Sequence, residues 1–281
     1  MITVGGTVTS EDLRNGDYPW DSFDPEHYLR QNYATVHEDD RRTLAFVRDF
    51  FAEAFAGDPV RTGRRGIDVG TGANLYPALA MLPFCDRLTL YEHSRANVDW
   101  LVGQQCDGWP SWAEVWEKFW LLLCERRAYG ELGGNPRHEL AKCADVVEGS
   151  VFALSGSDRR WDIGTMFFVA ESITPAYAEF VAAVDHFLGV LRPGAPFAIA
   201  FMQHSTGYQV ADNRFPAIAV GADDVLRCLF RRAAGVLIQR TVADGKPLRD
   251  GYRGMIIACG RAMAGSDPDP SGTTRPTRSR G

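Results

Sequence analysis

The stretch that decides the fold is Gly66-Ile67-Asp68-Val69-Gly70-Thr71-Gly72. An apolar run enters a turn of small residues, where glycine permits a sharp bend and a close approach of the backbone to a ligand. Leu75 stands where the third glycine of a G-x-G-x-x-G dinucleotide fingerprint belongs, and the Lys-Ser/Thr pair of a phosphate-binding loop is absent. The motif therefore predicts a strand and a glycine turn for a ligand other than a pyrophosphate or a triphosphate.

Acidic residues accompany three of the predicted strands. Asp68, just before the turn, suits a ligand with an ammonium group beside a ribose. Glu92 closes the next apolar run, twenty positions after Gly72, where a carboxylate accepts hydrogen bonds from ribose hydroxyls. Asp145 stands beside Val146 on the third run. Because the carboxyl ends of parallel strands meet at one edge of a sheet, we expect the three acids to line one crevice and to bind an adenosine-type cofactor.

Apolar runs and helical patterns alternate through most of the chain. Five of these runs are expected to form strands: residues 66–69, 88–91, 144–147, 161–168 and 197–202. A closing antiparallel pair is expected from two further runs, 236–241 and 252–259. The alternation predicts an α/β fold, with a mostly parallel seven-stranded sheet and helices on both faces.

Three regions stand apart from this alternation. Residues 1–60 contain an irregular leader and a helical pattern, and residues 61–262 form the predicted ligand-binding domain. The tail at 263–281 is rich in Pro, Ser, Thr and Arg and is expected to be disordered. An insertion at about 103–143 has aromatic residues at helical spacing: Trp109, Trp112, Trp116, Phe119 and Trp120. Such a helix either packs on the sheet or domain edge, or forms the aromatic wall of a ligand pocket or partner surface.

Composition excludes several classes of protein. The 281 residues carry a formal net charge of −6, which gives no global attraction to nucleic acid or anionic lipid. No apolar run approaches the roughly 18–20 residues that cross a bilayer. The six cysteines are scattered without a C-x-x-C pair, so we expect reduced thiols, a cytoplasmic location and no metal site.

Further motifs extend over residues 23–259. They are Phe23-Asp24-Pro25-Glu26-His27-Tyr28-Leu29 with Tyr33, Ile67 to Tyr76, Glu92-His93-Ser94-Arg95-Ala96-Asn97, Lys142-Cys143-Ala144-Asp145-Val146, Leu191-Arg192-Pro193-Gly194, His204-Ser205-Thr206-Gly207-Tyr208 and Phe215 to Gly221. Together they resemble the class I S-adenosylmethionine-dependent methyltransferases, and more narrowly the family of nicotinamide, phenylethanolamine and thioether methyltransferases. The N-terminal tyrosine motif and the segment after the fifth strand point to this family, whereas the glycine motif is shared by the whole superfamily.

The resemblance implies a Rossmann-like methyltransferase fold with an N-terminal helical lid and S-adenosylmethionine as cofactor. Tyr28 and Tyr33 correspond to lid tyrosines, which cover the substrate and touch the methionine carboxylate. The residues implied for the cofactor, besides these two, are Asp68, Gly70, Thr71, Gly72, Asn74 and Tyr76 around the methionine moiety, Glu92 and Asn97 at the ribose, and Asp145 and Val146 at the adenine.

The resemblance also implies an acceptor site. Glu171 matches a position where relatives carry an acid near the substrate amine, so Glu171 and Tyr28 are the expected catalytic residues. Nicotinamide-binding members place an aspartate where this chain has Phe201, which makes nicotinamide an unsuitable acceptor. Phe201, His204 and Tyr208, with Glu171, are the expected substrate-binding residues.

The expected function is methyl transfer from S-adenosylmethionine to a small molecule, at an amine nitrogen by the family resemblance. The transfer is a metal-independent in-line displacement, since alignment of nucleophile, carbon and sulfur is the main requirement. The alternatives are O- or C-methylation of a small metabolite, a nicotinamide-dinucleotide oxidoreductase, which Leu75 disfavours, and a non-catalytic protein with the cofactor fold. The oligomeric state is left open.

Overall fold

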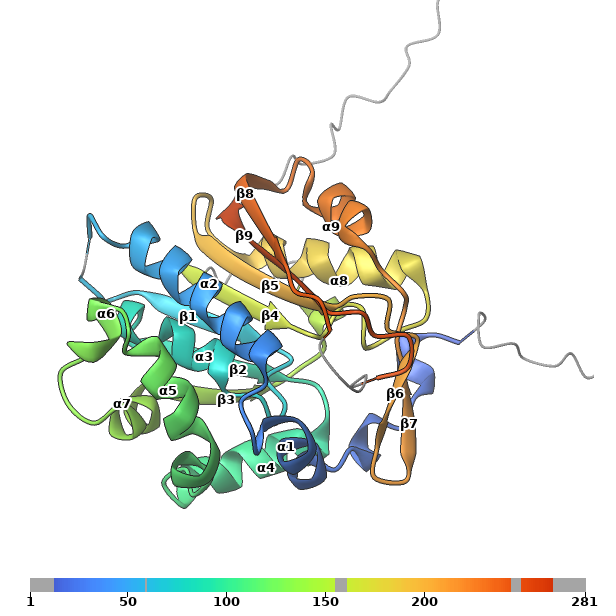
Figure 1. Ribbon diagram of the computed structural model, residues 1–281, viewed down its shortest axis with the longest axis horizontal. Helices are drawn as coiled ribbons and strands as arrows, with labels where there is room; N and C mark the ends of the chain where they lie inside the picture. Colours follow the sequence, from blue (N-terminus) through green and yellow to red (C-terminus); the bar gives the residue numbers. More distant parts are fainter. Residues whose placement is uncertain (1–12, 59, 155–160, 244–248, 265–281) are drawn as a thin grey trace, which may run out of the picture.

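The computed structural model describes residues 13–58, 60–154, 161–243 and 249–264. Within them a seven-stranded sheet has the order β3-β2-β1-β4-β5-β9-β8 (Figure 1). Its strands are β1 (Arg65–Val69), β2 (Arg87–Glu92), β3 (Ala144–Glu148), β4 (Ile163–Phe167), β5 (Pro196–Met202), β8 (Ala233–Arg240) and β9 (Met255–Ala262). β9 is antiparallel to β5 and to β8, whereas the other pairs are parallel. The predicted α/β sheet is confirmed.

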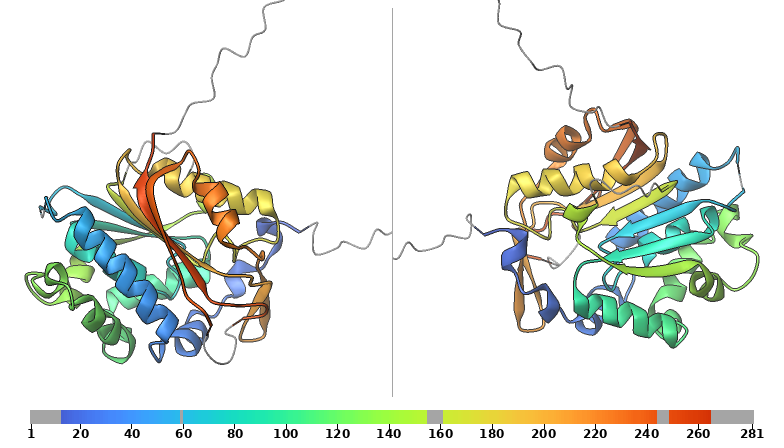
Figure 2. Two further views of the ribbon diagram at one scale, coloured as in Figure 1. Left: turned by 45° about the horizontal axis from the view of Figure 1, so that its top comes forward. Right: turned by 180° about the vertical axis from the view of Figure 1, so that it is seen from behind.

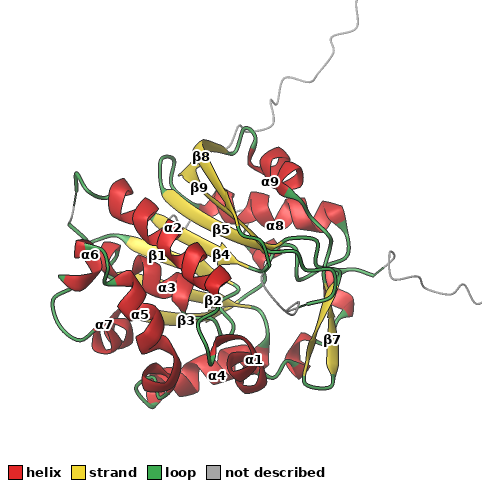
Figure 3. Ribbon diagram, viewed as in Figure 1, coloured by secondary structure: helices red, strands yellow, loops and turns green. Residues whose placement is uncertain are grey.

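Helices cover both faces of this sheet (Figures 2 and 3). One face is covered by α2 (Glu38–Ala54), α3 (Tyr76–Met81) and α4 (Arg95–Cys106), and the other by α8 (Tyr177–Val190) and α9 (Ala222–Leu229). Because side chains of a strand alternate between faces, β5 contributes to both cores. Its residues Ala198, Ala200 and Met202 join the first core, and Phe197, Ile199 and Phe201 join the second.

The N-terminal segment lies outside the sheet, against a hairpin that the sequence did not predict. The helical pattern expected within residues 1–60 forms two helices, α1 (Pro25–Tyr33) and α2. Asp24 is the N-cap residue of α1, and its Oδ1 accepts a hydrogen bond from the N–H of His27 at 2.8 Å. The hairpin consists of β6 (Gly207–Val210) and β7 (Asn213–Pro216) and stands beside the N-terminal segment in Figures 1 and 2.

The insertion is a packing element. Trp109 has a left-handed φ of 62°, so the expected continuous helix is interrupted there. A π-helical turn (Trp112–Trp116) leads into α5 (Glu117–Leu123), followed by α6 (Arg127–Gly130) and α7 (Pro136–Cys143). α5 packs against α2 and α3, and the four tryptophans of the insertion are buried. Of the two interpretations, packing at the domain edge is therefore the one observed.

The remaining predictions on the chain ends fall partly outside the described residues. The tail from residue 265 onward and the leader up to residue 12 lie outside the described residues. None of the described helices is both long and apolar enough to span a bilayer. The six cysteines are free thiols.

Candidate active site

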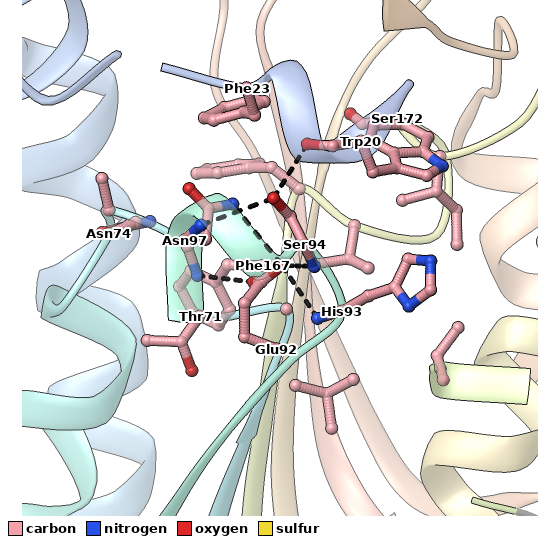
Figure 4. A pocket seen from close by; sticks show the side chains of 18 of the residues that line it. Trp20, Phe23, Thr71, Asn74, Glu92, His93, Ser94, Asn97, Phe167 and Ser172 are labelled. Carbon is pink, nitrogen blue, oxygen red and sulfur yellow. Dashed lines mark hydrogen bonds between the residues drawn. The ribbon is translucent and has the colours of Figure 1, made fainter. Parts of the chain in front are cut away.

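A cavity lies at the carboxyl ends of β1, β2 and β4, beneath the N-terminal segment. Figure 4 shows Trp20 and Phe23 of that segment on one side of it, with Thr71, Glu92 and Asn97 facing them. The predicted site residues that line this cavity are Tyr28, Tyr33, Gly70, Thr71, Gly72, Asn74, Glu92, Asn97 and Tyr208. The structure thus brings the lid tyrosines, both β–α turns and one hairpin residue together.

The glycine turn has a backbone that requires glycine. Gly70 and Gly72 have φ angles of 68° and 51°, in the left-handed region that side-chain-bearing residues rarely adopt. A Cβ atom on Gly70 would collide with the side chain of Val169 in the loop after β4. The Gly70 N–H donates to the carbonyl of Tyr91 at 2.7 Å. The turn therefore packs between the neighbouring loops, and its backbone faces the cavity.

Glu92 organises the next turn with both carboxylate oxygens. Oε2 accepts from the N–H of Gly72 at 2.8 Å, and Oε1 accepts from the N–H groups of His93 at 2.9 Å and Ser94 at 2.8 Å (Figure 4). Burial raises the pKa of Glu92, while the hydrogen bonds from Ser94 and Gly72 act in the opposite direction. One carboxylate thus ties the glycine turn to the start of α4.

Two buried amide atoms in this cavity have no hydrogen-bond partner among the described residues. They are Nδ2 of Asn74 and Oδ1 of Asn97. Leaving a buried polar atom unsatisfied costs about 1–3 kcal/mol, which a polar ligand would recover. Asn97 Nδ2 lies 3.5 Å from Glu92 Oε1, so its free oxygen and the carboxylate offer acceptors side by side for a ribose diol. Asn74 offers a donor on the side of the glycine turn. This set fits a nucleoside that carries an anionic or carbonyl group.

Asp145 and Val146 do not reach this cavity, so the expectation that they lie at the crevice is wrong. In the register of β2 and β3 they face Thr89 and Leu90, while the carboxyl end pairs Glu92 with Glu148. Asp145 is exposed near the start of β3. The loop residues 149–151 line the cavity in their place.

Asp68 and Tyr76 are buried behind the turn and do not line the cavity. Asp68 Oδ1 accepts from the Thr165 hydroxyl at 2.7 Å, and burial raises its pKa to about 7. The Tyr76 hydroxyl donates to Asp40 Oδ1 at 3.2 Å. Both residues support the turn from below, and neither is among the residues that line the cavity.

Three of the four expected acceptor residues are also set back from the cavity. Phe201 is fully buried in β5 and packs on Phe180 of α8, with 5.8 Å between ring centres. His204 has a left-handed φ of 61° and is not a lining residue. Glu171 is fully buried, and its Oε1 accepts from the Met202 N–H at 2.9 Å. The expectation that these three line the acceptor site is therefore wrong, whereas Tyr208 does line the cavity.

The cavity also contains residues that sequence reasoning missed. Trp20 and Phe23 come from the N-terminal segment, Ser172 follows β4, and Arg249 precedes β9. Phe23 begins the N-terminal tyrosine motif but was given no role there, and the other three belong to no motif, so only the folded chain brings them together. The described residues contain no group of three or more His, Cys, Asp or Glu side chains placed to hold a metal.

Comparison with known proteins agrees with this arrangement. The model of the NNMT/PNMT/TEMT family matches residues 13–260. Phenylethanolamine N-methyltransferase of Homo sapiens is 26% identical over 229 residues, covering 78% of this chain and 80% of that protein, and the Sus scrofa enzyme is 24% identical over 264 residues, covering 86% and 89%. The N-methyltransferase NodS from Bradyrhizobium japonicum, solved with S-adenosyl-L-homocysteine, shares the fold with a TM-score of 0.51 at 13% identity, covering 86% of this chain and 93% of that chain.

The family model spans the lid, both β–α turns and the closing strands, which are the parts that form the cavity. S-adenosylmethionine is the cofactor, in agreement with the two unpartnered amide atoms of Asn74 and Asn97 and with the Glu92 carboxylate that lines the cavity. This chain belongs to the NNMT/PNMT/TEMT family and is an S-adenosylmethionine-dependent methyltransferase.

Proposed function

We propose that this enzyme methylates an amine nitrogen of a small molecule. The observation that carries the proposal is the shape of the site: a polar cofactor end at the sheet edge continues into an aromatic chamber beneath Trp20, Phe23 and Tyr28. The choice of nitrogen rests on the relatives named phenylethanolamine N-methyltransferase.

The cofactor end would hold S-adenosylmethionine through residues already described. Glu92 and Asn97 would bind the ribose hydroxyls, and Asn74 with the glycine turn would bind the methionine part beneath Tyr33. When bound, the cofactor supplies a methyl carbon activated by a sulfonium leaving group. The protein then needs mainly to align the acceptor and to exclude water.

The acceptor end supplies orientation and a place for a proton. The nitrogen must be uncharged when it attacks, and it loses a proton on methylation. Ser172 lines the cavity, and its hydroxyl donates to Glu171 Oε1 at 3.1 Å. We assign Glu171 as the group that accepts this proton through Ser172, because the carboxylate does not touch the cavity itself. A metal ion has no role in this scheme, so activity should survive EDTA.

The test is a panel of matched acceptors that differ only in amine, hydroxyl or thiol. Purified enzyme is incubated with S-adenosylmethionine, and products are followed by mass spectrometry with fragmentation to place the methyl group. Nitrogen methylation of the amine members is expected. Methylation confined to oxygen, sulfur or carbon would replace the proposal by one of these alternatives, and cofactor binding without any turnover on a broad panel would favour a non-catalytic protein.

A further inference from the structure

A buried arginine lies at the acceptor end of the cavity. Arg249 comes shortly before β9, lines the cavity and is 7% exposed. Taking a guanidinium out of water is costly unless hydrogen bonds and an opposite charge compensate for the lost solvation. The partners of Arg249 therefore indicate what it binds.

The contacts of this guanidinium are with neutral groups. Nη1 donates to Ser172 Oγ at 2.6 Å, and Nη2 donates to the Tyr28 hydroxyl at 3.0 Å. Cζ lies 4.2 Å from the centre of the Tyr208 ring, a cation–π contact. Among the described residues Arg249 has no ion pair within 4.0 Å. The guanidinium carries five N–H donors, so the two hydrogen bonds leave donors for a ligand.

Compensation by Glu171 is indirect. The two side chains are joined through the Ser172 hydroxyl, which accepts from the arginine and donates to the carboxylate. Burial raises the pKa of Glu171, although the Met202 N–H and Arg249 act in the opposite direction. Glu92, a second carboxylate near the cavity, is already bound by three backbone N–H groups. No carboxylate therefore contacts the Arg249 guanidinium directly in the described part of the site.

The position of Arg249 separates it from the cofactor end. Of its partners, Ser172 follows β4 and Tyr208 lies in β6, whereas the residues that fit the nucleoside follow β1 and β2. Tyr28 reaches it from the N-terminal segment that covers the cavity. Among the described residues that line the cavity, Arg249 is the one arginine, and no lysine lines it.

We propose that the acceptor carries a carboxylate, which Arg249 binds together with the Tyr28 hydroxyl. The planar guanidinium fork matches a carboxylate with two parallel hydrogen bonds. The acceptor is then an aromatic amino acid or a similar amino acid, since Trp20, Phe23 and Tyr208 surround the remaining space. A simple cationic amine would instead place its charge beside the arginine. This inference rests on the proposed methylation of a small-molecule amine.

The first experiment measures binding and needs no turnover. Calorimetric titration of 3-phenylpropionate, its neutral amide and phenethylamine into the enzyme saturated with S-adenosylhomocysteine compares three charges on one scaffold. The acid is expected to bind at least tenfold more tightly than the amide and the amine. In Arg249→Met this preference should disappear, and in Arg249→Lys it should be reduced. Arg127→Met, which removes an exposed arginine from α6, is the control and should retain the preference. An acid that binds no better than its amide overturns the inference.

The cofactor has a methionine carboxylate of the same chemistry, and a second titration distinguishes the two sources. S-adenosylhomocysteine and 5′-methylthioadenosine, which lacks the amino-acid part, are titrated into the wild type and Arg249→Met. Both ligands should lose less than threefold in affinity. A loss of tenfold or more for S-adenosylhomocysteine alone would assign Arg249 to the cofactor and overturn the inference.

Turnover of phenylalanine against phenethylamine, and of tryptophan against tryptamine, separates this inference from the proposed function. Nitrogen methylation with at least tenfold higher kcat/KM for the acids is expected. Faster methylation of the decarboxylated amines would leave the proposed function intact and refute the carboxylate. Oxygen methylation of hydroxy acids with the same preference would refute nitrogen and retain the carboxylate.

Discussion

The two ends of the cavity are built in different ways. The cofactor end lies within residues 70–97, where two consecutive β–α turns are fixed by left-handed glycines and by one carboxylate that binds backbone N–H groups. The proposed acceptor end takes Tyr28, Ser172, Tyr208 and Arg249 from four distant segments and is held by side-chain contacts. Cofactor binding therefore depends on a local sequence motif, whereas acceptor choice depends on residues that only the tertiary fold brings together.

Gly70→Ala should have the largest effect, confined to the cofactor end. The new Cβ would collide with Val169, and an alanine at φ 68° costs a further 1–2 kcal/mol or so. We expect the affinity for S-adenosylhomocysteine to fall by more than a hundredfold in titration calorimetry. Adding Val169→Ala should restore part of the affinity, because it removes the collision and leaves the backbone cost.

Gly103→Ala is the matched control for this substitution. Gly103 lies within α4, and a Cβ there would have no described atom within 4 Å. Binding should be unchanged and the melting temperature slightly higher, since alanine is the better helix former by about 1 kcal/mol. Equal binding by the Gly70 and Gly103 variants would mean that the turn does not approach the cofactor.

Glu92→Gln should have the next largest effect. The amide replaces one acceptor oxygen by a donor that faces backbone N–H groups, and it removes the charge that a ribose diol would meet. Charge-assisted hydrogen bonds contribute about 1.5–3 kcal/mol each, which predicts roughly tenfold to 150-fold weaker binding of S-adenosylhomocysteine. Asp99→Asn, an exposed acid paired with Arg95 on α4, should bind normally. An affinity of Glu92→Gln within twofold of the wild type would contradict the ribose assignment.

The same contrast explains what the sequence could predict. The mostly parallel sheet and the first two turns were accessible, because hydrophobic periodicity and a glycine turn are local signals. The prediction for the adenine side was wrong by a shift along β3. The apolar run 144–147 does not show where the strand ends, and the strand continues to Glu148. Gly149, whose Cβ would collide with the Tyr91 hydroxyl, marks the turn after β3 as Gly70 marks the turn after β1. For β1 and β3 the glycine that directly follows the strand therefore marks its end.

The acceptor end had no comparable signal. Phe201 was assigned to it because nicotinamide-binding members of the family carry an aspartate at this position, but the residue points to the face covered by α8. Arg249 stands between two antiparallel strands without a motif, and the β6–β7 hairpin that supports Tyr208 was not recognised. Tyr28 and Tyr33, the lid tyrosines that the resemblance implied, both line the cavity. α1 is nine residues long and ends at Tyr33, with 5.9 Å between the two rings.

Cofactor binding should slow hydrogen exchange of the N-terminal lid. Tyr28 and Tyr33 cover the cavity, and bonds such as Ser94 Oγ to the Trp20 carbonyl at 2.8 Å tie the segment to the cofactor turn. A ligand beneath them adds contacts, so amides from 28 to 33 should exchange several-fold more slowly with S-adenosylhomocysteine. The amides of α8, on the opposite face, are the internal control. Equal protection of 28–33 in both states would make this segment a static scaffold.

The smallest effect on the acceptor KM is expected at His204, which lies four positions before Tyr208, where a larger effect is expected. His204 and Tyr208 both follow β5, but only Tyr208 lines the cavity, beneath Arg249. Tyr208→Leu removes the ring that supports the guanidinium, a contact of about 0.5–2 kcal/mol, and should raise the acceptor KM twofold to thirtyfold.

His204→Asn keeps a residue that tolerates the left-handed φ of 61°, and it removes the imidazole without opening the fold. Because His204 is set back from the cavity, its KM and kcat should stay within twofold of the wild type. The two variants are compared in one assay, with melting temperatures to verify folding. A KM change for His204→Asn as large as that for Tyr208→Leu would place the imidazole at the acceptor, and the boundary of the acceptor end would then have to include the turn before β6.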